Sequence, residues 1–314
     1  MGERAQTSAR VLGQSSVRSG AVAGRPDGQR DSALAESGGG TPPVIDAAFA
    51  RWLADRAGQQ LLRVRDEVGF ADAAALKSAG DRAAHDLLRA ELARWRPADA
   101  VLSEEDDHAR VAWQDGEHAT IRPERLGAGR VWIIDPLDGT REFAEEGRTD
   151  WAVHVALWTA DCTSPSCLAA GAVAMPAQHR TIATDHPPAY PPLPLDVDGG
   201  RLRIAASRTR PPAFVTALAE EIGADLVPMG SAGVKIAAVI NGEADAYVHA
   251  GGQYEWDSAA PVAVALATGL HASRIDGSTL KYNEANPKLP DLVVCRKDLA
   301  PRLLAALQRH LPSQ

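Results

Sequence analysis

The sequence predicts an α+β protein with two unlike halves, because the pattern of expected strands and helices changes near residue 200. Before that point, two helical segments are followed by apolar, strand-like runs that can pair as an antiparallel sheet. After it, strands and helices alternate along the chain, which is typical of an α/β arrangement. We therefore expect halves at 43–200 and 201–314, with the functional site between them.

The first half begins with two expected helices. Asp46 can cap a helix whose apolar residues recur at helical spacing up to Val68. A second helix is expected to follow Asp81 and to stop at Pro97, which cannot continue it. Strands are then expected at 100–102, 131–134, 151–158, 168–175 and 180–184, and the polar residues 106–129 are expected to form a loop.

The second half follows a proline-rich stretch at 187–194. Its strands are expected at 202–206, near Leu226, at 246–250 and at 292–295. Its helices are expected from Pro211, after Ser231, after Trp256 and from Leu299.

Charge and composition exclude several classes of function. The chain has 314 residues and a formal net charge of −8, which disfavours binding to the backbone of a nucleic-acid polymer. An acidic protein that acts on an anionic substrate needs bound cations or local basic residues, so the charge favours a metal site. No apolar run is long enough to cross a membrane.

The first 42 residues and the cysteines indicate a cytoplasmic protein. Residues 1–42 are rich in Ser, Gly, Ala and Arg without strong apolar periodicity, so we expect a disordered tail, and no continuous hydrophobic stretch marks a secretory signal. Cys162, Cys167 and Cys295 form no Cys-x-x-Cys pair, which favours reduced thiols in the cytosol. A zinc half-site at Cys162 and Cys167 is disfavoured because no second pair of ligands accompanies it.

Residues 131–140, Val-Trp-Ile-Ile-Asp-Pro-Leu-Asp-Gly-Thr, form the most informative segment. The apolar run predicts a buried strand, which must stop at Pro136 because proline removes a backbone donor and fixes φ. Asp135 and Asp138 can then point at one spot, and Gly139 lets the backbone approach a ligand closely. Crowded carboxylates repel each other unless a hard cation such as Mg²⁺ neutralises them. The alternative is an ordinary turn with two solvated aspartates.

Two distant segments favour the metal interpretation. Glu104 and Glu105 follow the strand expected at 100–102, which can deliver one of them to the same site. Asp257 lies at the start of an Ala-rich helix, where the positive end of the helix dipole favours an anion. Taken alone, the glutamates could be a solvated loop and Asp257 a cap. Their combination with residues 131–140 predicts a metal site.

Basic and hydroxyl residues of the second half offer a place for a phosphate. Ser231 opens a helix that carries Lys235 four positions later, which makes a plausible phosphate cradle. Arg208, after the strand at 202–206, could supply a second cation. A helix cap at Ser231 and solvated charges at Arg208 and Lys235 are the alternatives.

Together these motifs resemble a known family. The order Glu104-Glu105, then Asp-Pro-Leu-Asp-Gly-Thr at 135–140, then Trp256-Asp257 is similar to the signature of the lithium-sensitive, Mg²⁺-dependent phosphatases typified by inositol monophosphatase. Within that superfamily, residues 103–105, 138–143 and 255–257 are closer to the CysQ-type 3'-phosphoadenosine 5'-phosphate phosphatases. The resemblance runs from about Ala47 to the C-terminus.

The resemblance implies a layered αβαβα sandwich of the inositol monophosphatase and fructose-1,6-bisphosphatase type, with two or three Mg²⁺ ions per site. The implied metal ligands are Glu104 (the first residue of the Glu pair), Asp135, the Leu137 carbonyl, Asp138 and Asp257. Asp81 would work with Thr140 to orient the attacking water, although without the family Asp81 is better read as an ordinary N-cap. The implied substrate contacts are Gly139, Thr140, Arg208, Ser231 and Lys235.

The activity implied by the resemblance is that of a 3'(2'),5'-bisphosphate nucleotidase. Such an enzyme releases AMP and phosphate from 3'-phosphoadenosine 5'-phosphate, serves sulfate assimilation and is inhibited by Li⁺. An inositol monophosphatase or fructose-1,6-bisphosphatase is the first alternative, and a catalytically inactive ligand-binding relative is the second. The sequence does not fix the oligomeric state, for which a homodimer is one option.

Overall fold

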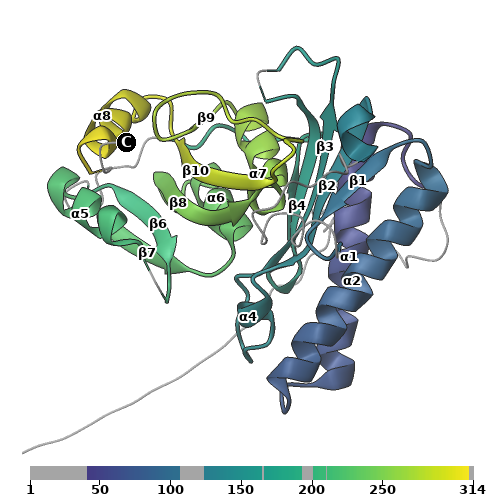
Figure 1. Cartoon of the computed structure of the whole chain (residues 1–314). Helices are drawn as coiled ribbons and strands as arrows, with labels where there is room; N and C mark the ends of the chain where they lie inside the picture. The colour runs from purple at the N-terminus through teal and green to yellow at the C-terminus, as the bar shows by residue number, and fades with distance from the viewer. Residues whose placement is uncertain (1–40, 107–123, 165, 193–200, 210, 311–314) are drawn as a thin grey trace, which may run out of the picture. The chain divides into compact units, whose positions relative to one another are not determined.

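Two five-stranded sheets and the helices packed on them form the layers of the fold (Figure 1). The computed structural model describes residues 41–106, 124–164, 166–192, 201–209 and 211–310. Within residues 42–314 the layers run helix pair, sheet, helix pair, sheet, helix pair, so the expected αβαβα sandwich is confirmed. Residues 1–40 of the expected tail, and most of the loop expected at 106–129, lie outside the described residues.

The first sheet has the strand order β1-β2-β3-β4-β5, with β1 parallel to β2 and the other pairs antiparallel. Its strands are β1 (Ala100–Ser103), β2 (Arg130–Asp138), β3 (Ala152–Thr159), β4 (Leu168–Met175) and β5 (Arg180–Ala183). Helices α1 (Asp46–Val68) and α2 (Ala73–Trp95) cover its outer face. Their apolar faces bury Phe49, Leu53 and Leu88 against Trp132 and Val153, which removes these large side chains from water.

The second sheet is mixed, with the order β7-β6-β8-β10-β9. Its strands are β6 (Arg203–Ser207), β7 (Asp225–Met229), β8 (Ala246–Tyr254), β9 (His271–Ser273) and β10 (Lys288–Cys295). Helices α6 (Ala232–Ile240) and α7 (Glu255–Thr268) lie between the two sheets, and α5 (Ala213–Ile222) and α8 (Ala300–His310) cover the outer face of the second. This arrangement brings the start of α7 close to both sheets.

Small residues let α7 lie close to the first sheet. A Cβ atom added at Gly171 of β4 would be 2.6 Å from Ala263 Cβ and 2.7 Å from the Ala260 carbonyl oxygen, both in α7. No side chain fits there, so Gly171 is required for the close approach of backbone to backbone.

The two N-terminal helices differ from expectation at their starts. The N-cap of helix α1 is Ile45, which makes no side-chain hydrogen bond to the helix. The Asp46 carboxylate instead accepts hydrogen bonds from Arg96 and Arg130, so the prediction that Asp46 caps the helix is wrong. Helix α2 already begins at Ala73, where Asp72 is the cap and accepts two backbone N–H groups. Asp81 therefore lies inside the helix and not at its start. The Ala-rich residues before it have high helix propensity but little apolar periodicity, which is why the pattern placed the start too late.

Strand β2 was expected to stop at Pro136, but it continues to Asp138. Asp135 pairs with His154 and Asp138 with Ala152, so β2 holds one more residue than β3 between these pairs. This is a β-bulge, in which Pro136 needs no ladder donor. The bulge keeps both aspartates on the strand while it turns the intervening backbone.

Other differences are small. The remaining expected strands and helices are confirmed with their ends shifted by a few residues, while the short helix α4 (Thr140–Phe143), the 3₁₀ turns η1 (Glu124–Gly127) and η2 (Pro176–Gln178), and β9 were not expected.

Cys162 and Cys167 form a disulfide across the turn between β3 and β4, so the expectation of reduced thiols is wrong for this pair. The antiparallel strands bring their Cα atoms to 5.0 Å, within the range that a disulfide spans. Cys295 is free and buried.

Candidate metal centre

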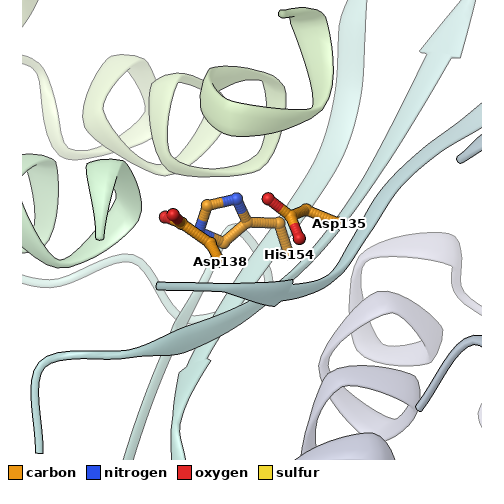
Figure 2. Close-up of side chains that lie close together, drawn as sticks. All are labelled: Asp135, Asp138 and His154. Atoms are coloured by element: carbon orange, nitrogen blue, oxygen red, sulfur yellow. The ribbon is translucent and has the colours of Figure 1, made fainter. Parts of the chain in front are cut away.

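Two aspartates of β2 and a histidine of β3 meet at the bulge. Asp135, Asp138 and His154 each offer a ligand atom, and these atoms all lie within 4.8 Å of one another (Figure 2). All three side chains are buried, with exposed fractions of 1%, 8% and 0%. Ionisable groups are rarely buried without partners, so this cluster marks a functional site.

The backbone around the bulge is held by its own side chains. The Leu137 N–H donates to Asp135 Oδ1 at 3.0 Å, and the Thr140 hydroxyl donates to the Leu137 carbonyl oxygen at 3.1 Å. Between them Gly139 has a φ of 87°, and an added Cβ would lie 3.2 Å from both the Asp150 carbonyl oxygen and Ser231 Cβ. Glycine is therefore required for this tight turn into α4.

Glu104 and Asp257 complete a group of four carboxylates. Because β1 is parallel to β2, Glu104 follows β1 at the same edge of the sheet, and its carboxyl group hydrogen-bonds that of Asp135. Asp257 lies in the first turn of α7, where its Oδ2 accepts the Tyr254 N–H at 2.6 Å. Glu105 is exposed, whereas Glu104 is partly buried, which favours Glu104 as the functional residue of the pair.

Burial and the charges of neighbouring carboxylates act on Asp135 and Asp257. Burial raises the pKa of Asp135 well above its ordinary value, and the charges of Glu104, Asp138 and Asp257 raise it further. Burial also raises the pKa of Asp257, followed by the charge of Asp138, while the opposing effect of Lys235 is smaller. Crowded, buried carboxylate oxygens are the ligands that hard divalent cations prefer, so the residues present fit Mg²⁺.

The second half of the chain meets this cluster through hydrogen-bond donors. Asp138 Oδ2 accepts the Ser231 hydroxyl at 2.6 Å and the Gly233 N–H at 2.7 Å. Ser231 also caps α6, because its Oγ accepts the Val234 N–H at 3.0 Å. Lys235 is buried, and its ammonium donates to the Gly230 carbonyl oxygen at 2.8 Å. Ser231 and Lys235 therefore lie beside the carboxylates, as members of one short loop and helix start.

Arg208 contacts α4 and not the metal-site carboxylates named above. Its guanidinium donates to Glu142 Oε1 at 2.8 Å and to Glu145 Oε1 at 2.7 Å, and these carboxylates raise the pKa of Arg208. The neighbouring Asp150 carboxylate accepts the Gly230 N–H at 2.6 Å and pairs with Arg148. Arg208 is thus paired within the chain and would have to exchange these partners to bind a phosphate.

The turn of α2 that carries Gly80 and Asp81 lies against the same segment through Gly80. A Cβ atom added at its neighbour Gly80 would lie 2.6 Å from Phe143 Cε1 and 3.0 Å from Leu137 Cδ2. This turn of α2 therefore packs directly on the segment that follows the bulge. Asp81 itself is partly buried.

Sequence reasoning missed three polar residues of the site region, namely His154, Glu142 and Asp150. His154 stands inside a strand of otherwise apolar residues, and that isolated position is the one signal that could have identified it. Glu142 and Asp150 are acids among other acids of residues 138–150, so their contacts with the second half had no local signal.

An αβαβα sandwich that gathers buried carboxylates from two strand ends and a helix start has the layout of a metal-dependent phosphatase. Comparison with known proteins supports this class. The chain belongs to the inositol monophosphatase family, whose sequence pattern matches residues 45–190 and 197–311.

Two relatives differ widely in their similarity to the chain. A 3'-phosphoadenosine 5'-phosphate phosphatase of Mycobacterium leprae is 49% identical over 273 residues, which cover 84% of this chain and 94% of the relative. The 3'(2'),5'-bisphosphate nucleotidase CysQ of Escherichia coli is 28% identical over 246 residues, which cover 73% and 91%.

Solved structures agree on the fold. Mycobacterium tuberculosis SuhB has a TM-score of 0.60 and 23% identity, covering 86% of this chain and 98% of its own. Inositol monophosphatase-II from Staphylococcus aureus has a TM-score of 0.62 and 19% identity, covering 82% and 94%. Among the described residues, no helix combines the length and apolar character that a membrane span requires.

Proposed function

We propose that the protein is a Mg²⁺-dependent 3'(2'),5'-bisphosphate nucleotidase that hydrolyses 3'-phosphoadenosine 5'-phosphate to AMP and phosphate. The main support is the 49% identity, over most of both chains, to a phosphatase named for that substrate. The group of buried carboxylates supports the chemistry, because a phosphate monoester needs strong neutralisation of its oxygens to react. The expected setting is sulfate assimilation in the cytoplasm, with inhibition by Li⁺, and a homodimer is one option.

The metal ligands in this proposal are Glu104, Asp135, the Leu137 carbonyl, Asp138 and Asp257. Two or three Mg²⁺ ions bound there would supply an activated water and neutralise charge on the phosphoryl and leaving oxygens. Asp135 would be the central ligand of this set, since burial and the charges of Glu104, Asp138 and Asp257 all raise its pKa. Most of these ligands lie in the half formed by residues 43–200, and Asp257 comes from the half formed by residues 201–314, while residues 1–42 are proposed to take no part.

Thr140 and Asp81 are proposed to orient the attacking water. The Thr140 hydroxyl can accept a hydrogen bond from that water while its own hydrogen points to the Leu137 carbonyl oxygen, the direction it has in the structure. Asp81, in the turn of α2 that packs on Leu137 and Phe143, would accept a hydrogen bond from the water. Both residues would act on a reactant held by the neighbouring carboxylates.

Substrate binding is proposed at Gly139, Thr140, Ser231, Lys235 and Arg208. Gly139 would contribute through its backbone, because a glycine has no side chain to hinder a close approach. Ser231 and Lys235 offer a hydroxyl and a cation next to Asp138, and the distal phosphate of the nucleotide would lie towards them or towards Arg208. Arg208 can contribute only if the phosphate replaces Glu142 or Glu145 as its partner.

A substrate comparison tests the proposal. Phosphate release is measured for 3'-phosphoadenosine 5'-phosphate, 3'-AMP, inositol 1-phosphate and fructose 1,6-bisphosphate at one Mg²⁺ concentration. We expect the highest kcat/KM for 3'-phosphoadenosine 5'-phosphate, because binding energy at the distal phosphate helps to position the reacting one. An equal or higher kcat/KM for inositol 1-phosphate would replace the nucleotide reading with the inositol alternative, and the absence of turnover with all four would favour an inactive relative.

A further inference from the structure

His154 lies at the centre of the carboxylate cluster but has no role in the proposed reaction. It stands opposite Asp135 in the pairing of β3 with β2, and its side chain is fully buried. Its Nδ1 atom lies 3.0 Å from the carbonyl oxygen of Trp256. A carbonyl oxygen can only accept, so Nδ1 carries the hydrogen and Nε2 is the atom that faces Asp138.

The surroundings of Nε2 are unusual for a buried nitrogen. It lies 3.3 Å from Asp138 Oδ2 but makes no well-aligned hydrogen bond to any group in the described part of the chain. On its other side is α6, where a Cβ atom added at Gly233 would lie 1.9 Å from Nε2. The ring edge is therefore enclosed between a carboxylate oxygen and the backbone of Gly233. Figure 2 shows the ring beside the Asp138 carboxylate.

This enclosure argues against His154 as a metal ligand. Asp138 Oδ2 already accepts two hydrogen bonds, from Ser231 and Gly233, which occupy the two lone-pair directions of that oxygen. A cation bound by Asp138 would therefore contact Oδ1. Nε2 faces the occupied oxygen, so the ring contacts the side of the carboxylate that faces away from the cation.

We propose that His154 is a positioning residue of the metal centre, which rests on the proposed function for the identity of the ligands. The imidazole edge limits rotation of the Asp138 carboxylate, so that Oδ1 stays directed at the cation. The Nδ1–H bond to Trp256 holds the first turn of α7, which carries Asp257 as the next residue. One ring of β3 thus couples a ligand of β2 to a ligand of α7, and supporting groups of this kind commonly change metal affinity by 10–100-fold.

Three substitutions separate the two contacts. His154→Leu removes both. The amide of His154→Asn reaches the position of Nδ1 and can keep the bond to Trp256, whereas the amide of His154→Gln reaches the position of Nε2 beside Asp138. His271→Asn is the matched control, because His271 is a strand histidine of the second sheet whose ring hydrogen-bonds to Ser273.

The experiment measures Mg²⁺ affinity by calorimetry and by the rise in Tm on Mg²⁺ addition, with no substrate present. We expect the Kd for Mg²⁺ to rise by about ten-fold or more for His154→Leu and less for each amide variant, with no change for His271→Asn. The Tm in EDTA identifies any variant that fails to fold. If His154→Leu does not fold, the Mg²⁺ affinities of His154→Asn and His154→Gln test the inference instead. In turnover assays the Mg²⁺ concentration for half-maximal rate should rise while kcat at saturating Mg²⁺ changes little.

Two results would overturn the inference. One is a folded His154→Leu protein with the Mg²⁺ affinity of the wild type. The other is a loss of Mn²⁺ or Zn²⁺ affinity much larger than the loss for Mg²⁺, which would identify His154 as a direct nitrogen ligand. Neither result depends on which phosphate ester is hydrolysed, so failure of the nucleotidase proposal would be seen separately, as normal Mg²⁺ binding without turnover.

Discussion

Two acidic clusters of the site region differ in how their charge is neutralised. In the metal-site cluster of Glu104, Asp135, Asp138 and Asp257, burial and the charges of neighbouring carboxylates raise the pKa values of Asp135 and Asp257. Asp138 and Asp257 accept hydrogen bonds from neutral donors. The arginine-paired carboxylates, Glu142, Glu145 and Asp150, contact Arg208 and Arg148. Both look alike in the sequence, and the position of nearby arginines decides which of them needs an external cation.

The largest expected effect comes from neutralising the centre of the first cluster. Asp135→Asn should lower kcat by roughly 10³-fold or more, because one change disrupts every ion proposed to contact Asp135. The same variant should keep or raise its Tm in EDTA, since it removes a buried charge that three carboxylates repel. The control is Asp245→Asn, because Asp245 is equally buried but paired with Arg203, and we expect it to lower Tm while activity remains. A drop in Tm for Asp135→Asn in EDTA would contradict the comparison.

Metal removal should make stability depend on pH. The folded-state pKa values of Asp135 and Asp257 are raised, and that of Glu255 is raised to about 7 by burial. The unfolded chain therefore loses these protons first, and the free energy of unfolding without metal should fall as the pH rises from about 4 through 7. Mg²⁺ should then raise Tm more at pH 8 than at pH 5, by roughly 3 °C or more. Thermal scans at both pH values with EDTA or Mg²⁺ measure this, and an equal rise at both would contradict it.

A smaller effect is expected for the cation beside the metal-site carboxylates. Lys235→Met keeps the buried volume over Tyr247 but removes the charge. KM for 3'-phosphoadenosine 5'-phosphate should rise by roughly ten-fold, which corresponds to the free energy of one hydrogen bond to a charged group. The rise should be smaller for 3'-AMP, and kcat should change little. Steady-state kinetics with both nucleotides check this. An equal rise for both substrates would place Lys235 away from the distal phosphate.

The smallest effect is expected within the arginine-paired cluster. Arg208→Gln should change kcat by less than about three-fold, because Arg208 lies against α4 and its partners are carboxylates, not the cation ligands. If Arg208 exchanges these partners for the distal phosphate, KM for the bisphosphate rises and that for 3'-AMP does not. Arg201→Gln, which affects an exposed pair with Asp225, is the control. A kcat loss as large as that of Asp135→Asn would show that the two clusters act as one.

The strands, the helices and the grouping of carboxylates could be predicted because they depend on local signals, whereas the layered sandwich was implied by the family resemblance. Apolar runs followed by acids, as at 131–138, predict that a strand is present and which acids it carries, and parallel pairing then brings Glu104 to the same edge. The roles proposed for these residues come from the family resemblance and remain predictions. Patterns that compare one residue with its neighbours were sufficient for this part of the molecule.

Features that depend on contacts between distant segments could not be predicted in this way. Asp46 was expected to cap a helix, but Arg96 and Arg130 bind it from other elements. The strand continues through Pro136 because a bulge against β3 removes the need for its donor. Cys162 and Cys167 are joined because a hairpin brings them together, and composition carries no record of that geometry.

The contact of Gly171 with α7 affects the position of the helix that carries Asp257. Because the helix that carries Asp257 touches the first sheet through Ala260 and Ala263, methyl-sized groups set how far that helix stands from the strands beside Asp135. A single added methyl group at Gly171 would have to push the layers apart, since the nearest atoms include backbone. The separation between ligands on opposite layers therefore depends on some of the smallest side chains of the interior.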